Sequence, residues 1–297
     1  MSAFSSVDCS GHSPAPADHL ASVAGQVPSR WERVARLLGD AAVARLAQAR
    51  VVVVGLGGVG SYAAESLLRS GVGGVRLVDF DNVCMTNFNR QIEACMPALG
   101  RPKATALADR LRSIDPNAHI EPMVTAFGPE TASEVLADSP DLVVDAIDNL
   151  TSKGHLLSVC RDQAIPVVSS LGAAGRCDPT AVRIADLAHS RQDPMGRTLR
   201  KMLRQRWGFP RQGRFGILAV FSLEKPQGPS DCHHPWSDDQ RDSSETGTEA
   251  TADSKRHRLM LGSASFVTGT FGLFCAFAAV QTLVDTISRP VVDRPKP

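Results

Sequence analysis

The chain has 297 residues, 43% of them hydrophobic, and its 32 lysines and arginines nearly balance its 31 aspartates and glutamates. A chain of this length and apolar content can bury a core, which excludes a disordered protein. The net charge of +1 gives no global sign of a nucleic-acid partner, so any basic surface must be local.

The seven cysteines are scattered, odd in number and never form a C-x-x-C pair. This pattern argues against a thiolate zinc site, so no zinc is predicted, and it favours a reducing compartment. The first residues lack a basic start followed by an apolar run, which argues against a secretory signal. We therefore expect a cytoplasmic protein.

Two polar segments flank or interrupt the apolar sequence. Residues 1–29, rich in Ser, Ala, Pro and His, predict a disordered tail. Residues 225–258 contain almost nothing apolar and predict a disordered surface loop. Because apolar sequence resumes at Leu259, this loop is expected to interrupt one domain.

The apolar pattern between these segments predicts alternating strands and helices. Residues 30–49 carry apolar side chains at helical spacing and predict one or two short amphipathic helices. Residues 51–54 are all valine and are closed by Gly55, the pattern of a parallel strand buried on both faces. Further strands are predicted at 75–78, 119–124, 142–146 and 166–169, and helices at 61–70, 103–114, 129–137 and 152–163. The sequence therefore predicts an α/β fold, a doubly wound and mostly parallel sheet with helices on both faces.

The run from 259 to 284 carries no charge and is long enough to span a bilayer. Its many small and polar residues suit a helix buried against the sheet better than one that faces lipid. We expect a core helix, and membrane association is the alternative that the sequence leaves open.

A glycine-rich segment with Gly55, Gly57, Gly58 and Gly60 leaves the first strand and opens a helix. Backbone N–H groups and the positive helix end of such a turn face an anion, so phosphate is the expected guest, although NAD binding or tight packing would also fit. Asp79 ends the second strand where a carboxylate can accept hydrogen bonds from ribose hydroxyls; an ordinary strand-capping role is the alternative. Together they predict a nucleotide site.

The next motifs depart from the dehydrogenase pattern. Residues 86–91 read T-N-F-N-R-Q, residues 100–103 read G-R-P-K, and residues 145–149 read D-A-I-D-N after an apolar strand. With the glycine turn and the D-x-D after it, this ordered set resembles the ubiquitin-activating-enzyme-like (ThiF/MoeB/HesA) superfamily. The resemblance implies a Rossmann-like adenylating-enzyme fold that uses ATP to join a carboxylate to AMP.

The resemblance also implies roles for single residues. Arg90 and Lys103 are expected to contact the ATP phosphates, because fixed cations help two anions to meet. Asn87 and Gln91 are expected to orient the phosphates or the substrate. Asp148 is expected to hold the Mg²⁺ that accompanies ATP, a hard cation that prefers oxygen ligands. Asn149 completes the predicted nucleotide site, whereas Asp145 could simply anchor the neighbouring turn.

Residues 30–33, R-W-E-R, resemble the R-Y-x-R sequence that precedes the nucleotide domain in these enzymes. There the second arginine reaches the ATP site of the partner subunit. The resemblance therefore implies a homodimer in which Arg33 acts catalytically in trans. A helix-capping or surface role is the alternative on residue type alone.

Later motifs resemble the threonylcarbamoyladenosine dehydratases within this superfamily. They lie at 172–180, 186–194, 220–224 and 267–272. The resemblance covers residues 30 to about 288, which defines a ThiF-type adenylating domain and leaves 289–297 as a C-terminal tail. The 225–258 loop is where this chain departs most from the family.

This resemblance implies ATP-dependent dehydration of threonylcarbamoyladenosine in tRNA. The threonyl carboxylate is adenylated, and the carbamoyl group then closes onto the activated carbonyl. Ring closure is intramolecular and needs no thiol, so Cys177 is expected to be structural. The alternatives are activation of the C-terminus of a ubiquitin-like sulfur-carrier protein, an NAD-linked dehydrogenase, and a non-catalytic nucleotide-binding scaffold. A sulfur-transfer or electron-transfer protein is a further partner that the sequence leaves open.

A basic cluster lies between residues 191 and 214, opposed only by Asp193. Leu199, Met202, Leu203 and Trp207 share one face of a predicted helix, which leaves the cations pointing outward. The cations expected to bind tRNA phosphates are Arg197, Arg200, Lys201, Arg204 and Arg206. A solvated helical face is the alternative.

Overall fold

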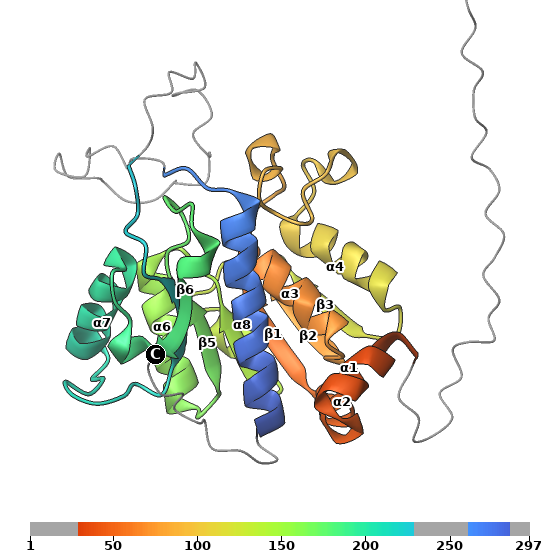
Figure 1. Cartoon of the computed structure of the whole chain (residues 1–297), viewed down its shortest axis with the longest axis horizontal. Helices are drawn as coiled ribbons and strands as arrows, with labels where there is room; N and C mark the ends of the chain where they lie inside the picture. The colour runs from red at the N-terminus through yellow and green to blue at the C-terminus, as the bar shows by residue number, and fades with distance from the viewer. Residues whose placement is uncertain (1–28, 229–260, 286–297) are drawn as a thin grey trace, which may run out of the picture.

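The computed structural model describes residues 29–228 and 261–285. The predicted C-terminal tail, almost all of the predicted N-terminal tail and most of the predicted 225–258 loop lie outside these residues. At the centre is a seven-stranded sheet of order β3-β2-β1-β4-β5-β7-β6 (Figure 1). The strands are β1 (Arg50–Val54), β2 (Gly74–Val78), β3 (His119–Met123), β4 (Leu142–Asp145), β5 (Val167–Ser170), β6 (Val182–Asp186) and β7 (Leu218–Ser222). Neighbouring strands are parallel except for β6 and β7.

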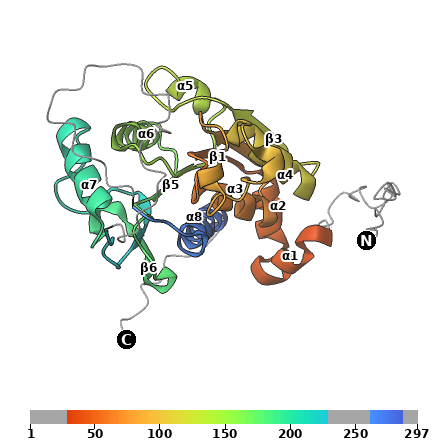
Figure 2. The same ribbon diagram turned by 90° about the horizontal axis from the view of Figure 1, so that it is seen from above.

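Helices cover both faces of the sheet (Figure 2). They are α1 (Glu32–Leu38), α2 (Asp40–Gln48), α3 (Gly60–Arg69), α4 (Lys103–Ile114), α5 (Ala132–Val135), α6 (Leu150–Asp162), α7 (Pro194–Arg206) and α8 (Ser265–Asp285). Along β1, Val51 and Val53 join the core shared with α2, α3, α4 and α8. Val52 and Val54 join the core shared with α5, α6 and α7. The predicted doubly wound α/β fold is confirmed.

Several boundaries differ from the sequence prediction. The predicted helix at 129–137 shortens to α5 and ends before Asp138 and Ser139, whose φ angles are positive. Strands β6 and β7 were not predicted. In the N-terminal segment Gly39, with φ +91°, separates α1 from α2. The apolar face predicted for this segment is buried in α2 but not in α1, where Leu37 is 81% exposed.

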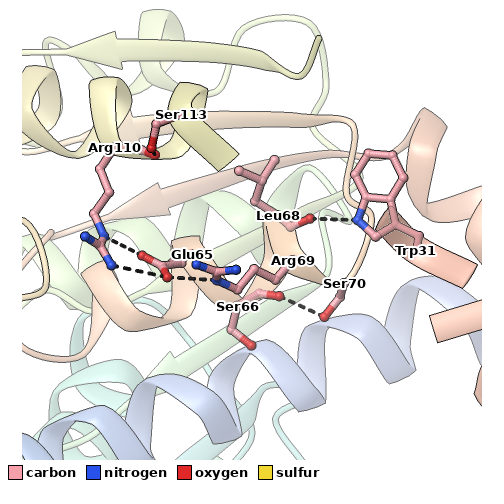
Figure 3. A network of polar contacts seen from close by, with 8 residues as sticks. All are labelled: Trp31, Glu65, Ser66, Leu68, Arg69, Ser70, Arg110 and Ser113. Atoms are coloured by element: carbon pink, nitrogen blue, oxygen red, sulfur yellow. Dashed lines mark hydrogen bonds and ion pairs between the residues drawn. The ribbon is translucent and has the colours of Figure 1, made fainter. Parts of the chain in front are cut away.

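The N-terminal segment packs at the edge of the sheet where the strands begin (Figure 3). The indole Nε1 of Trp31 donates to the carbonyl of Leu68 at 3.4 Å, at the end of α3. Arg30 forms an ion pair with Asp115, which follows α4. In a parallel α/β unit the helices end at this edge, opposite the carboxyl ends of the strands. Helix α1 is therefore far from the nucleotide turn of its own chain.

A buried carboxylate ties α3 to α4 in the same region (Figure 3). Glu65 accepts from Arg69 at 2.8 Å and from Arg110 at 2.6 Å. Burial by itself raises the pKa of Glu65, but the two arginines lower it overall. Glu65 is therefore a fully paired, ionised acid.

Helix α8 is the one helix in the described part of the chain that is long and apolar enough to cross a membrane. Most of its residues are buried inside the fold, against α3 and the sheet. Gly272 permits this close approach, since a Cβ there would lie 2.5 Å from the carbonyl oxygen of Val59. This packing favours the predicted core helix. Phe266, Leu273 and Phe277 remain exposed on its outer face.

Candidate functional site

The glycine turn between β1 and α3 is packed so closely that side chains are excluded from it. A Cβ at Gly60 would lie 1.8 Å from the carbonyl oxygen of Gly55, and one at Gly58 would lie 2.9 Å from the Thr268 hydroxyl on α8. Gly55 itself has φ +86°, which favours glycine. The turn thus lies at the carboxyl end of β1 and the start of α3, where backbone amides can receive phosphate.

Asp79 fastens this turn to the end of β2. Its Oδ2 accepts from the Leu56 amide at 2.6 Å and its Oδ1 accepts from the Asp81 amide at 2.8 Å. Burial raises the pKa of Asp79, although Lys103 and the two amides oppose the rise. Each carboxylate oxygen retains further acceptor capacity, so this clamp is compatible with the predicted ribose contact.

Lys103 is held beside Asp79 by the start of α4. Its amide donates to the carbonyl of Asp81 at 2.9 Å, and its Nζ lies 2.8 Å from the Asp81 carboxylate. Burial by itself lowers the pKa of Lys103, but Asp79, Asp81 and Glu93 raise it overall. The buried ammonium therefore stays protonated, and Asp81, with 42% of its side chain exposed, is its only hydrogen-bonded acid in the described residues.

Asn87 is buried and shapes the segment that follows β2. Its Oδ1 accepts from the Cys84 amide at 3.1 Å, which closes the 3₁₀ turn Met85–Asn87. Asn87 therefore fixes the local backbone, and this turn presents the next residues to the glycine turn.

Arg90 and Gln91 lie against the glycine turn. A Cβ on Gly58 would be 3.1 Å from Arg90 Cγ, and a Cβ on Gly57 would be 4.0 Å from Gln91 Nε2. Arg90 donates to the carbonyl of Thr86 at 2.7 Å. The Oε1 of buried Gln91 has no hydrogen-bond partner in the described part of the chain. A guanidinium and a buried amide thus lie where phosphates would enter.

The segment after β4 completes the site. A Cβ on Gly55 would lie 2.7 Å from the carbonyl oxygen of Ala146, so this segment lies against the glycine turn. Asp148 and Asn149 follow it and are exposed. Asn149 Oδ1 accepts from the amides of Thr151 and Ser152 and caps α6. The nucleotide role predicted for Asn149 stays a prediction.

Asp148 fits one mode of magnesium binding. No group of three or more His, Cys, Asp or Glu that could hold a metal occurs among residues 29–228 and 261–285. Mg²⁺, however, is usually held by one or two carboxylates together with substrate phosphates and water. A single exposed Asp148 beside a phosphate-binding turn suits that mode. Mg²⁺ bound there would neutralise phosphate charge.

Sequence reasoning missed a buried ion pair beneath this site. Lys153 Nζ lies 2.7 Å from Asp145 Oδ2, and both side chains are 0% exposed. Asp145 also accepts from the Ser169 hydroxyl at 2.6 Å, and Lys153 donates to the carbonyl of Ile147 at 2.9 Å. Asp145 thus anchors the neighbouring turn, the alternative stated for it. Lys153 repeats at helical spacing with the buried Leu156 and Leu157, a signal that would have placed it inside.

Glu93 was also missed. It is 3% exposed, and neither carboxylate oxygen makes a hydrogen bond of normal geometry within the described residues. Burial raises the pKa of Glu93 to about 7. Lys103 and Asp79 are the charged groups that act on it.

The basic helix α7 is anchored at its N-terminus by a second buried ion pair. Asp193 Oδ2 lies 2.6 Å from Arg176, and its Oδ1 caps the helix by accepting from the Gly196 amide at 2.7 Å. Asp193 is therefore used inside the fold, although its charge still acts on Arg200 of α7.

The apolar face predicted for α7 packs inward. Leu199 and Leu203 are buried, while Met202 and Trp207 are partly buried against Gly154 of α6. The predicted amphipathic helix is confirmed.

The cations of α7 divide into two groups. Arg200 donates to the Ser190 hydroxyl, and Arg204 donates to the carbonyl of Pro210 at 3.2 Å. Burial lowers the pKa of Arg200, as do Arg204 and Arg197. The other three predicted cations are exposed: Arg197, Lys201 and Arg206.

Two of the described cysteines are kept as neutral thiols by burial. Cys160 and Cys275 are buried, and burial raises the pKa of each to about 12. Cys177 is exposed, and its amide donates to the Glu224 carboxylate at 3.1 Å. Its backbone, not its sulfur, makes the contact, in line with a structural role.

A doubly wound sheet, a glycine-rich turn and converging cations at the strand ends define a nucleotide-binding α/β protein. More narrowly, the chain belongs to the ThiF family, whose model matches residues 31–294. The tRNA threonylcarbamoyladenosine dehydratase of Escherichia coli (strain K12) is 35% identical over 265 residues, which cover 88% of this chain and 95% of that protein.

Two further relatives and one solved structure are also similar to this chain. The tRNA threonylcarbamoyladenosine dehydratase of Haemophilus influenzae is 34% identical over 260 residues, with 86% of this chain and 93% of that protein covered. The crystal structure of the E. coli enzyme in complex with ATP matches with a TM-score of 0.75 and 34% identity, covering 86% of this chain and 94% of the other. The molybdopterin-synthase adenylyltransferase of H. influenzae is 31% identical over 161 residues, only 54% of this chain and 64% of that protein.

Proposed function

We propose that this chain is an ATP-dependent tRNA threonylcarbamoyladenosine dehydratase. One observation carries the proposal: Arg90, Gln91 and the segment before Asp148 lie against one glycine turn, and Lys103 acts on Asp79, which binds the same turn. This arrangement suits a triphosphate, and the similarity to the dehydratases extends over most of the chain.

The residues divide the work of adenylation. Arg90 and Lys103 stabilise charge as a substrate carboxylate oxygen attacks the α-phosphorus of ATP and pyrophosphate leaves. Asn87 holds the Arg90 segment in place, and Gln91, whose Nε2 is directed at Gly57, donates that amide N–H to a phosphate. Asp148 holds Mg²⁺, and Asp79 positions the ribose.

Ring closure needs orientation more than an enzyme nucleophile. The carbamoyl group of the same nucleoside attacks the acyl carbon, loses a proton and expels AMP. Nucleophile and electrophile already belong to one molecule, so proximity is supplied by the substrate. Cys160 and Cys275, whose pKa values are raised to about 12 by burial, have no part in this route.

We also propose a homodimer in which Arg33 serves the partner's site. Arg33 is exposed on α1, at the edge of the sheet opposite its own glycine turn. The same helix exposes Leu37, and α8 exposes Phe266, Leu273 and Phe277, apolar surface that a second copy would cover.

Mixing two inactive variants tests this trans arrangement. An Arg33→Ala protomer paired with an Asp148→Ala protomer leaves one of the two symmetric sites intact. Roughly a quarter of wild-type activity should return after random reassembly. No recovery in verified mixed dimers would contradict it.

The cations of α7 are proposed to bind tRNA phosphates, and the protein is proposed to work in the cytoplasm. The exposed members, Arg197, Lys201 and Arg206, can track a phosphate backbone without loss of internal contacts. A sulfur-transfer or electron-transfer partner remains a prediction.

The decisive experiment incubates purified protein with ATP, Mg²⁺ and tRNA that carries threonylcarbamoyladenosine. The expected result is AMP and pyrophosphate in step with a nucleoside lighter by one water, seen by mass spectrometry under mild conditions. Unmodified tRNA is the control. Pyrophosphate exchange that depends instead on a ubiquitin-like carrier protein would favour the adenylyltransferase alternative.

A further inference from the structure

Glu93 has no evident structural use in the described fold. The other buried carboxylates all accept from described partners: Glu65 from two arginines, Asp79 from two backbone amides, Asp115 from Arg30, Asp145 from Lys153 and Asp193 from Arg176. Glu93 is 3% exposed, and neither of its carboxylate oxygens makes a hydrogen bond of normal geometry with the described part of the chain. A buried acid of this kind destabilises the fold when it ionises, so its presence calls for another explanation.

The surroundings of Glu93 belong to the nucleotide site. Glu93 follows Gln91 by two residues, and the amide of the intervening Ile92 lies 3.4 Å from the Ser61 hydroxyl, which itself donates to the carbonyl of Gly57 at 2.7 Å. The charged groups that act on it are Lys103 from α4 and Asp79 from the end of β2. Glu93 therefore lies behind the glycine turn, close to the cation that would meet phosphate.

We propose that Glu93 is a positioning residue that takes up one proton when ATP binds and thereby leaves Lys103 available to the phosphates. The proposal rests on the use of ATP proposed above. The proton comes from solvent and converts the Glu93 carboxylate to the neutral acid. No bond to the nucleotide is formed by Glu93.

The charges around Lys103 explain why this proton matters. Without nucleotide, the ammonium is surrounded by Asp79, Asp81 and Glu93. An arriving triphosphate adds negative charge to the same region, which disfavours ionised Glu93 and raises its pKa further from about 7. Protonation removes one negative charge that would repel phosphate and compete for Lys103. ATP affinity should therefore fall as the pH rises through this range.

Titration calorimetry measures the linkage directly. Mg-ATP is titrated into the full-length wild-type protein at pH 7.5 in two buffers of different ionisation enthalpy. If binding raises the pKa of Glu93 by one unit, roughly half a proton should be taken up per ATP. The Kd for ATP should weaken by up to about tenfold between pH 6 and pH 8.5.

Two variants test whether Glu93 is the group that takes up the proton when ATP binds. In Glu93→Gln the side chain is neutral at every pH, so the proton uptake should vanish and the pH dependence of the Kd should flatten to within about twofold. In Glu65→Gln, the matched control, uptake should match the wild type, because Glu65 is paired and ionised throughout.

The wild-type measurement does not depend on whether a variant folds. Mg-ATP binding by the wild type without proton uptake would overturn the role of Glu93 and leave the dehydratase proposal standing. Uptake that persists in folded Glu93→Gln would also overturn it. If the wild type fails to bind ATP, both proposals fall. An infrared difference spectrum should show a new carboxylic-acid band on ATP binding.

Discussion

Two buried lysines lie near the carboxyl edge of the sheet, and their partners differ. Lys153 and its partner Asp145 are both 0% exposed, and their contacts extend to Ser169 and Ile147. Lys103 is also buried, but its partner Asp81 has 42% of its side chain exposed. The Lys153–Asp145 pair is completely buried, whereas the Lys103–Asp81 pair has an aspartate that is partly exposed to solvent.

This difference separates a structural cation from one that can exchange ligands. Moving Lys153 would leave Asp145 charged in an apolar interior, a costly state. Moving Lys103 toward a phosphate would return Asp81 to water, which costs little. Burial of a lysine therefore does not by itself identify a functional site; the exposure of its partner does.

The largest expected effect follows removal of the sealed cation. Lys153→Ala should lower the free energy of unfolding by about 3–5 kcal/mol, because Asp145 is left buried without a partner. Urea denaturation measures the change. The double variant Asp145→Asn, Lys153→Met should recover part of the loss. A loss below about 1 kcal/mol for the single variant would show that the pair is not sealed.

The next effect concerns catalysis. Lys103→Ala should reduce kcat/KM for tRNA-dependent AMP formation by about 10²–10³, the range for loss of one fixed charge-stabilising group. The unfolding free energy should change less than in Lys153→Ala. Arg101→Ala is the matched control, since Arg101 lies nearby but is exposed and paired with Asp109. Equal losses in both variants would argue against a specific role for Lys103.

Glu93 sharpens the comparison, because no comparable acid without an ion-pair partner lies beside Lys153 among the described residues. The pKa of Glu93 is raised in the folded state to about 7, so ionisation destabilises the fold as the pH rises above the unfolded value. Relative to wild type, Glu93→Gln should therefore gain about 2 kcal/mol of stability between pH 5.5 and pH 8. Thermal or urea unfolding at the two pH values measures it, and a pH-independent difference would contradict it.

The smallest effect is expected for cations that are not buried at all. Arg197→Glu with Lys201→Glu should raise the KM for tRNA about tenfold, or about 1.4 kcal/mol. It should also reduce the slope of log affinity against log salt by about two. The KM for ATP should not change. Unaltered tRNA kinetics would favour the solvated-face interpretation of α7.

Burial on both faces makes β1 the clearest of the predicted strands, although the predicted β3 is mostly not buried and the buried β7 was missed. β1 is an uninterrupted valine run, so its burial was evident without a structure. β6 lies at the edge of the sheet, with only Val182 fully buried and Arg183 exposed, so it lacks that pattern. The helix predicted at 129–137 is longer than α5, which ends at Val135; Leu136 already leaves the helical conformation with φ −99° and ψ 14°.

Some residues of the site were also predictable from the sequence, and others were not. Gly60 and Lys103 belong to motifs whose order along the chain carries the information. Lys153 and Glu93 belong to none, because a charged residue within a predicted helix or loop is normally solvated. Helical spacing with Leu156 and Leu157 could have placed Lys153 inside, whereas only the three-dimensional structure shows that Glu93 is internal.

The contact between α8 and the glycine turn also bears on the order in which the molecule is made. Thr268 and Gly272 lie against Gly58 and Val59, so the last described helix forms the back wall of a turn encoded near the start of the domain. A ribosome must therefore synthesise α8 before the amides of the glycine turn acquire their final support. Incomplete translation products would lack this wall and would not compete with the finished protein for ATP.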